Sequence, residues 1–461
     1  MRSPLLRQCS LQQCKIMIAT AQSYDLRGRN ANEIADSLER AILAGRFRPG
    51  AKLPTMRQLA RTLAVSPVTV GAAFRLLRMR GLAAGDGRRG TIVNPRPQIE
   101  PASWPEAPAG VLDLAIGNPD PALLPKTRDL LKLIEADSTP HLYGGASNHP
   151  DLLKIAAQTF KSDGIPFNHI AVTSGAHDGI ERVLQAQLRV GDIVGVEDPG
   201  PFVTFDLVRT LGFRLKPIGI DAFGLLPAQL AQALDSGINA LIFTPRAQNP
   251  TGAAIDEKRA CELRRLLQRF PDVLLVENDP AALIAGVPPT SLVESRRVRW
   301  AVVRSVSKFL GPDLRLALIS GDALSISRLE ARQDLGPCWV SHILQRVVAA
   351  ALKDRAISRI VRHASETYAR RREAFVAALR RRGIETISRS GIYVWIPVRE
   401  EGAVIQGLLN AGWAVRAGER FRIKAAPAIR VMTSRLPVQD AERLASDIAR
   451  YTASRVPISS R

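Results

Sequence analysis

A regular alternation begins at Leu112, where short apolar runs alternate with segments of helical periodicity. The apolar runs are HIAVTS (169–174), IVGVED (193–198), ALIFTP (240–245), VLLVEND (273–279) and AVVRSV (301–306). Strands that alternate with helices form a mainly parallel sheet covered by helices on both faces. We therefore expect an α/β fold. Ligands of such sheets lie at the carboxyl ends of the strands, where loops and helix N-termini meet.

Residues suited to cofactor chemistry follow three of these runs. The tripeptide Ser174-Gly175-Ala176 opens a helical segment, whose free backbone N–H groups and dipole suit a phosphate. Asn249 lies in the turn NPTG after ALIFTP, and Lys308 follows AVVRSV, with Arg315 downstream. A lysine beside a phosphate-binding set can form a Schiff base with an aldehyde cofactor. Each residue alone is equally typical of a surface or a turn, but their common placement favours a site.

Residues 31–93 have a different organisation, with three helical segments followed by two short strand-like runs. Thr55 is a good N-cap for a short helix over 56–63, and Ser66-Pro67 opens the next with a cap and a first-turn proline. Two short helices joined by a tight turn form a helix-turn-helix, whose second helix enters the major groove of DNA. The hairpin that follows would be a wing, with Arg88 and Arg89 directed toward phosphates.

The apolar spacing within these segments predicts a small core. Ile34, Leu38, Ile42 and Leu43 share one face of the first helix. In the third helix a buried stripe leaves a separate face for DNA. The predicted stripe is Val70, Phe74 and Leu77, and the free face is Ser66, Val68, Thr69 and Ala72.

The charge distribution supports a polyanion partner. The net charge is +21, and residues 1–100 contain 17 Lys and Arg against 6 Asp and Glu, a net of +11. Such a basic module attached to a larger body suggests nucleic acid. A general compositional preference for arginine would also raise the charge, so this observation alone is not decisive.

We expect four segments along the chain: a tail over 1–29, a DNA-binding domain over 30–93, a linker over 94–110 and a large domain over 111–457. The linker carries five prolines, which favour extended, semi-rigid spacers. No apolar run reaches the roughly 18 residues that span a bilayer, and the first twenty residues lack a signal-peptide core. The four cysteines have no metal-binding spacing. We expect a cytoplasmic protein without a bound metal.

The N-terminal motifs resemble those of the GntR family of winged-helix regulators. The matches follow the patterns L-P-x-x-R-x-L-A, V-S-x-x-T-V and G-x-G-T, and they are Leu53, Pro54, Arg57, Leu59, Ala60, Val65, Ser66, Thr69, Val70 and Gly90-Thr91. The resemblance implies phosphate contacts from Arg57 and Thr69. Pro67 departs from the family, which often has an arginine there, so one basic contact is absent.

The motifs NPDP, HLYG, TSGA, EDP, TPR-x-x-NPTG and SVSK-x-LGPDLRLA follow in an order similar to that of fold-type I aminotransferases fused to GntR domains, the MocR subfamily. The resemblance covers residues 30–455. It implies that Lys308 binds pyridoxal 5'-phosphate covalently. It also implies a set of residues around the cofactor phosphate: Ser174, Gly175, Ala176, Ser305, Ser307 and Arg315.

The same resemblance implies four further roles. Asn249 would donate to the hydroxyl of the cofactor ring, and Tyr143 would reach the phosphate of the other subunit of a homodimer. Arg430 stands where the family's arginine pairs with a substrate carboxylate, a role for which its planar fork is suited. Phe202 is the candidate for stacking on the ring.

Two positions depart from active aminotransferases, which carry an aspartate on the pyridine nitrogen and a tyrosine three residues later. Asn278 and Ala281 occupy these positions in VENDPAAL. A neutral amide does not hold a pyridinium charge as a carboxylate does, so the cofactor would be a poorer electron sink. Asp279 would take this role if the strand register differs by one residue, and it is otherwise a turn residue before Pro280.

These observations favour a transcription regulator whose large domain senses pyridoxal phosphate or an amine effector, in control of vitamin B6 or amine metabolism, with little or no turnover. The alternative is a working aminotransferase. A third hypothesis, a DNA-binding module on a cofactor-free relic, conflicts with the presence of Lys308, Asn249 and Arg315 together.

Overall fold

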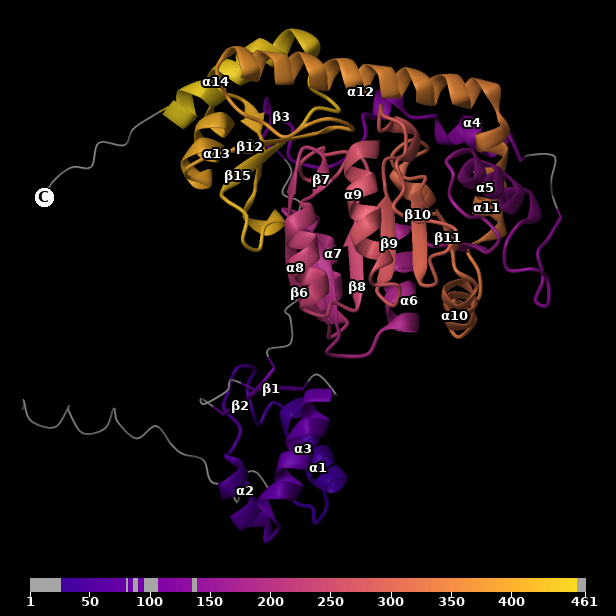
Figure 1. Ribbon diagram of the computed structural model, residues 1–461. Coiled ribbons are helices and arrows are strands. Elements are labelled where there is room, and N and C mark those ends of the chain that lie inside the picture. Colours follow the sequence, from indigo (N-terminus) through magenta and orange to yellow (C-terminus); the bar gives the residue numbers. More distant parts are fainter. Residues whose placement is uncertain (1–25, 80–81, 86–89, 95–106, 135–138, 454–461) are drawn as a thin grey trace, which may run out of the picture. The chain divides into compact units, whose positions relative to one another are not determined.

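The computed structural model describes residues 26–79, 82–85, 90–94, 107–134 and 139–453. The contacts divide the chain into two compact units, residues 1–99 and 100–461. Each unit is described separately below (Figure 1).

The N-terminal unit contains three helices and a two-stranded antiparallel sheet. These elements are α1 (Ala31–Leu43), α2 (Met56–Leu63), α3 (Pro67–Met79), β1 (Ala83–Gly85) and β2 (Thr91–Val93). Thr55 begins α2 with a capping box, in which its side chain accepts from the Gln58 amide and Gln58 returns a contact to the Thr55 backbone. α2 is followed by its C-cap residue Ala64, whose φ of 51° is left-handed and turns the chain sharply into α3. The predicted helix-turn-helix and hairpin strands are therefore confirmed.

The core of this unit contains most of the predicted apolar stripes, and the side chain of Leu43 lies outside the described residues. Its buried side chains include Ile34, Leu38, Leu59, Val70, Phe74 and Leu77, and Ile42 packs against them partly buried. Because three short helices share one small core, each depends on the others for its stability.

The second unit is built on an eight-stranded sheet with the order β4-β11-β10-β9-β8-β5-β6-β7. Pairing from β10 to β6 is parallel, whereas β4, β11 and β7 pair antiparallel. The prediction of a mainly parallel sheet is confirmed. The strands are β4 (Ile170–Thr173), β5 (Ile193–Asp198), β6 (Arg214–Asp221), β7 (Gly224–Leu225), β8 (Ala240–Phe243), β9 (Leu274–Asp279), β10 (Trp300–Ser305) and β11 (Ala317–Gly321).

Both faces of this sheet are buried, because successive strand residues enter two different apolar clusters. Leu275 and Val302 enter one cluster, and their neighbours Val276 and Val303 enter the other. The first is covered by α5 (Pro150–Ser162), α8 (Pro227–Asp235), α9 (Glu257–Gln268), α11 (His342–Lys353) and α12 (Arg355–Arg381), and α4 (Thr127–Lys132) contributes Leu130 to it. The second is covered by α6 (Ala176–Gln187), α7 (Phe202–Thr210) and α10 (Ala323–Asp334).

The C-terminal part is a smaller layer, and α12 extends from the large sheet to it (Figure 1). A three-stranded sheet has the order β12-β15-β14, and β13 pairs in parallel with β3. These elements, with two helices, are β3 (Leu112–Asp113), β12 (Tyr393–Pro397), α13 (Glu401–Asn410), β13 (Trp413–Ala414), β14 (Arg416–Ala417), β15 (Ala428–Met432) and α14 (Ala441–Ala453). In the described residues, no helix is long and apolar enough to cross a bilayer.

Candidate functional site

A cavity of about 170 Å³ lies where the carboxyl ends of β8, β9 and β10 meet the N-terminus of α6 and the C-terminal layer. Its lining combines a lysine, two amides and a histidine with apolar walls. The lining residues are His177, Pro201, Thr244, Ala247, Asn249, Asn278, Pro280, Ala281, Ile284, Lys308, Gly391, Ile392 and Tyr393. Of the residues predicted for cofactor binding, Lys308, Asn249 and Asn278 line this cavity directly.

Lys308 enters the cavity from the loop after β10. Its side chain is partly buried, and Nζ donates to the carbonyl oxygen of Gly117. Ser305 and Ser307 precede it, with their hydroxyls 3.1 Å apart, and the Ser307 amide donates to Ser305 Oγ at 3.2 Å. The two serines thus form a small polar turn beside the lysine.

A cradle of positive and N–H groups lies beside this turn. Gly175 has a φ of 98°, which favours glycine, and the guanidinium of Arg315 lies against it, with Nη2 2.9 Å from the position that a Cβ would take. Ala176 is the first residue of α6, and no side chain caps the N-terminus of this helix. In the described part of the chain Arg315 has neither a hydrogen-bonding partner nor a counter-ion. Such a cradle fits a phosphate. The amide of Ser174 is different, because it already donates to Asp178.

His177 is a cavity residue that was not predicted. Burial lowers the pKa of its imidazole, and the nearby Arg315 charge lowers it further, which favours the neutral ring. The sequence contained a signal for this role, because His177 is the second residue of the helix that Ser174-Gly175-Ala176 opens. A neutral imidazole there can donate one hydrogen bond into the cavity.

Arg430 lies in β15 and is 1% exposed. Its guanidinium donates to Asn249 Oδ1 at 3.0 Å and to the Ala115 carbonyl oxygen, while Nε has no partner. Burial lowers the pKa of Arg430 to about 10. No carboxylate pairs with it among the described residues, and a buried cation without an anion is costly. The arrangement therefore fits a ligand carboxylate.

The contact with Arg430 also orients Asn249. Its side-chain oxygen is occupied by the guanidinium, which leaves the amide N–H groups as donors toward the cavity. The turn that carries Asn249 is fixed by buried polar contacts, because Thr251 Oγ1 donates to Gln248 Oε1 at 2.6 Å and Gln248 Nε2 donates to Glu197 Oε2 at 3.2 Å. Burial raises the pKa of Glu197 to about 8.

Asn278 and Asp279 lie on opposite sides of β9. Asn278 lines the cavity, is 5% exposed, and its Oδ1 has no hydrogen-bond partner. Asp279 is 1% exposed and is bound by Arg246, with Nη2 to Oδ2 at 2.7 Å. Arg304 lies 3.5 Å from the same oxygen, and the Ala282 amide donates to Oδ1 at 2.9 Å. Asp279 is thus engaged in an ion-pair network that faces away from the cavity.

Phe202 does not line the cavity, contrary to its candidate role in ring stacking. It is the first residue of α7, is buried in the apolar cluster that covers one face of the sheet, and contacts Phe421 with ring centroids 5.3 Å apart. Pro201 lines the cavity instead. The physical reason is that α7 begins at Phe202, which turns that side chain into the helix packing interface.

Tyr143 also lies outside this cavity. Its side chain is 88% exposed and contacts Trp339 edge-on, with ring centroids 5.4 Å apart.

In the N-terminal unit, the proposed DNA-contacting residues are on the surface. Arg57, Ser66 and Val68 are exposed, Val68 at 76%, and Thr69 is half-buried. Ser66 also has a structural role, because its Oγ accepts from the Thr69 amide at 3.1 Å and so caps α3. The two wing arginines, Arg88 and Arg89, lie outside the described residues.

Comparison with known proteins matches both units. Residues 30–93 match the family "Bacterial regulatory proteins, gntR family", and residues 109–448 match "Aminotransferase class I and II". A helix-turn-helix regulator fused to an aminotransferase domain defines the MocR type, and this chain belongs to that family of DNA-binding transcription regulators.

Two curated relatives are transcription regulators. The chain is 39% identical to the vitamin B6 salvage pathway transcriptional repressor PtsJ of Salmonella typhimurium, over 91% of this chain and 98% of that protein. It is 26% identical to the pyridoxine biosynthesis regulator PdxR of Corynebacterium glutamicum, over 74% of this chain and 76% of that protein. In fold, it is similar to a Pyrococcus horikoshii kynurenine aminotransferase, with a TM-score of 0.68, 22% identity, and coverage of 75% of this chain and 91% of that one.

Proposed function

We propose that this protein is a regulator that binds pyridoxal 5'-phosphate and controls DNA binding in response to the cofactor or to an amine that reacts with it. One observation carries the proposal: Lys308 shares a cavity with Asn249 and Asn278, and two cations without counter-ions in the described residues, Arg315 and Arg430, lie next to it. Such a set matches a cofactor that carries an aldehyde and a phosphate, together with an amino acid that supplies a carboxylate.

The residues present fit the cofactor at each of its ends. Lys308 would bind it covalently. Its phosphate would lie in the cradle of Gly175 and Arg315, where a Cβ would collide with the guanidinium. The other residues proposed for the phosphate are Ser174, Ala176, Ser305 and Ser307. When bound, pyridoxal phosphate supplies an aldehyde that captures amines and a ring that withdraws electrons.

The ring would lie between Asn249 and Asn278. The free N–H groups of Asn249 would donate to the ring hydroxyl, and the amide of Asn278 would face the ring nitrogen. An amide does not stabilise a protonated ring nitrogen as a carboxylate does, and Asp279 is already bound by Arg246. Electron withdrawal is therefore weakened, while binding through Lys308 and Arg430 is kept. This combination suits a sensor better than a catalyst.

The effector would be an amine or amino acid, with Arg430 as the partner of its carboxylate. Effector binding changes DNA affinity only if the two conformations of the protein bind the effector unequally. We further propose that the protein acts in the cytoplasm as a homodimer on two DNA half-sites, with exposed Tyr143 reaching the neighbouring subunit's phosphate. The PtsJ and PdxR relatives suggest vitamin B6 genes as targets.

Visible absorption spectroscopy tests cofactor binding. Addition of pyridoxal phosphate should give an absorption band of the bound cofactor, and borohydride should attach the cofactor to the peptide that contains Lys308. Lys308→Ala is the control, and it should give neither the band nor the labelled peptide. A parent protein that stays colourless with excess cofactor overturns the proposal.

A working aminotransferase is the second candidate, because Lys308 and Asn249 line one cavity and Arg430 donates to Asn249. Multiple rapid turnovers with common amino acids would favour it over the regulator.

A further inference from the structure

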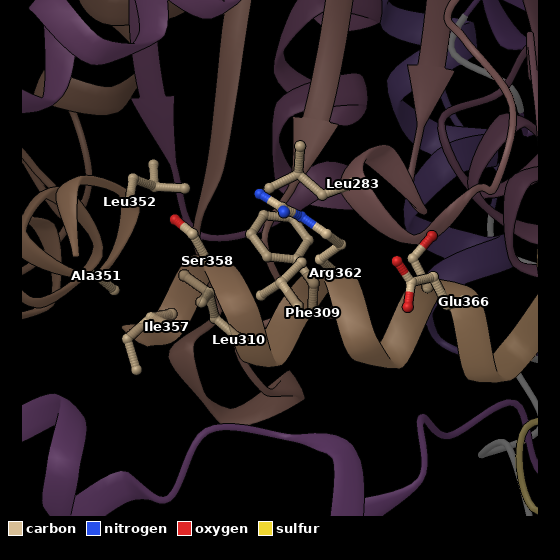
Figure 2. A pocket seen from close by; sticks show the side chains of 11 residues that line it. Leu283, Phe309, Leu310, Ala351, Leu352, Ile357, Ser358, Arg362 and Glu366 are labelled. Atoms are coloured by element: carbon tan, nitrogen blue, oxygen red, sulfur yellow. The ribbon is translucent and has the colours of Figure 1, made fainter. Parts of the chain in front are cut away.

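A second cavity, of about 330 Å³, lies against the N-terminal half of α12 (Figure 2). It is nearly twice the volume of the cavity that contains Lys308, which is about 170 Å³. Its lining residues are Leu283, Phe309, Leu310, Ala351, Leu352, Ile357, Ser358, Val361, Arg362, Ser365 and Glu366. The two cavities have no lining residue in common.

The floor of this cavity is apolar and well ordered by packing. Phe309, Leu310 and Val361 are 5%, 2% and 6% exposed, and they belong to the main hydrophobic cluster of the sheet. Leu283 forms a wall and is 51% exposed. An apolar floor beneath an open, partly apolar wall suits the hydrophobic body of a small molecule.

Two opposite charges from the same helix complete the lining. Arg362 and Glu366 are four residues apart on α12, so their side chains project from neighbouring turns. Figure 2 shows Arg362 extending toward Leu283, with Glu366 further along the helix. Within the described part of the chain, the two residues form no ion pair with each other or with any other group. Both charges are therefore available to a ligand.

We propose that this cavity is a second, non-covalent ligand site that binds a free α-amino acid with an apolar or aromatic side chain. The ligand carboxylate would pair with Arg362, its ammonium group with Glu366, and its side chain would lie on Phe309 and Leu310. Arg362 and Glu366 are both exposed at the rim of the cavity, so a molecule with both charges can pair with both, whereas a molecule with one charge can pair with only one of them. The volume lies at the small end of the range for ligand pockets, about 300–1,000 Å³.

The site is connected to the cofactor cavity by two short stretches of chain. Phe309 and Leu310 directly follow Lys308, and Leu283 lies between Ala282 and Ile284, of which Ile284 lines the cofactor cavity. A ligand on Phe309 would therefore limit the movement of the Lys308 loop. This coupling rests on the proposed cofactor function, whereas binding to the second site does not.

Calorimetric titration of the full-length protein with L-phenylalanine tests the site. We expect one ligand per chain and at least tenfold weaker binding in Arg362→Gln and in Glu366→Gln. Arg359→Gln is the matched control, because Arg359 is exposed on α12 and lies outside the lining. Arg430→Gln separates the two cavities, and it should leave this affinity unchanged within twofold.

Truncated probes assign each charge. Phenethylamine lacks the carboxylate, so its weaker binding should depend on Glu366 but not on Arg362, and hydrocinnamate should show the reverse. Absence of L-phenylalanine binding at millimolar concentration overturns the proposal, as does binding that is lost only in Arg430→Gln.

Sedimentation and cofactor absorption complete the test. A change of oligomeric state in Leu283→Arg would assign the cavity to an interface between copies, and it would also overturn the proposal. A protein that binds L-phenylalanine at Arg362 but stays colourless with pyridoxal phosphate would disprove the cofactor function and leave this site standing. A protein that becomes coloured with pyridoxal phosphate but does not bind L-phenylalanine would disprove this second site and leave the cofactor function standing.

Discussion

The two units present their functional residues in opposite ways. The helix-turn-helix takes its proposed DNA contacts from neighbouring positions on α2 and around the start of α3, where Arg57 and Ser66 are exposed. The cofactor cavity is assembled from segments between Gly117 and Arg430, where Asn278 and Arg430 are buried and Lys308 is partly buried. A surface that contacts a polymer requires only a rigid local scaffold. A small-molecule site requires distant segments to converge and leaves polar groups without partners until the ligand arrives.

The largest effect on stability should come from a substitution that disrupts the core of the N-terminal unit and leaves the cavity at Lys308 unchanged. Phe74 is 2% exposed in the N-terminal unit, and its replacement by alanine should cost about 3–5 kcal/mol of folding free energy. We expect Phe74→Ala to lose DNA binding, measured by fluorescence anisotropy, and to keep the absorption of bound pyridoxal phosphate. Phe74→Leu, which keeps most of the volume, should retain DNA binding. Loss of both activities together would mean that the two units do not fold separately.

A second effect concerns the electron sink. Asn278→Asp places a carboxylate at the proposed position of the ring nitrogen. Loss of one electrostatic partner at a developing charge commonly costs about 10²–10³ in rate, so restoring one should accelerate cofactor conversion to pyridoxamine phosphate by about that factor. Asn278→Ala is the control and should not accelerate it. Adding Ala281→Tyr reverses the second departure, because it supplies the tyrosine that active aminotransferases carry at this position. If Asn278→Asp is no faster than the parent, the weak electron sink does not explain slow turnover.

The fold and much of the site could be predicted wherever the signal was local. The caps Thr55 and Ser66 and the apolar stripe through Phe74 determine the helix-turn-helix from adjacent residues. Lys308 was found because a lysine after a buried strand must lie at the ligand-binding edge of the sheet. These inferences needed only the alternation of strands and helices and the chemistry of single residues.

The remaining features depend on contacts between distant segments. Whether Asn278 or Asp279 faces the ligand was undecided, because the partner of Asp279 is Arg246, 33 residues away. Phe202 was the stacking candidate, and its burial in the packing of α7 depends on its contact with Phe421, which is distant in the chain. The unpaired state of Arg362 and Glu366 was equally inaccessible, since their spacing favours a salt bridge with each other.

The buried carboxyl beneath the cofactor site should make stability depend on pH. Burial raises the pKa of Glu197 from 4.5 to about 8. The folded state therefore keeps a proton that the unfolded state releases, and the free energy of unfolding decreases as pH rises from about 5 to 8. Glu197→Gln cannot titrate and should weaken this decrease, by up to about 1.4 kcal/mol per pH unit. Denaturant unfolding at pH 6 and pH 8 measures it. Equal pH dependence in parent and variant would contradict a buried, protonated Glu197.

The smallest effect should be the change in DNA affinity when a single exposed arginine is replaced. Arg57→Ala removes one proposed phosphate contact, and it should weaken binding to all DNA sequences and reduce the salt slope of log Kd by about one unit. Arg88→Ala with Arg89→Ala should reduce the slope by about two units. Unchanged affinity and slope would show that these arginines do not contact phosphates. None of the three should alter cofactor absorption.

The most direct test of the account is whether filling the cavity at Lys308 changes DNA affinity. The duplex would be selected by the protein from a random-sequence pool, and its dissociation constant would be measured with and without pyridoxal phosphate. Allosteric coupling is typically about 1–3 kcal/mol, so we expect a change of at least about fivefold in the parent and no change in Lys308→Ala. Identical dissociation constants in the parent, with absorption showing that the site is filled, would contradict the account.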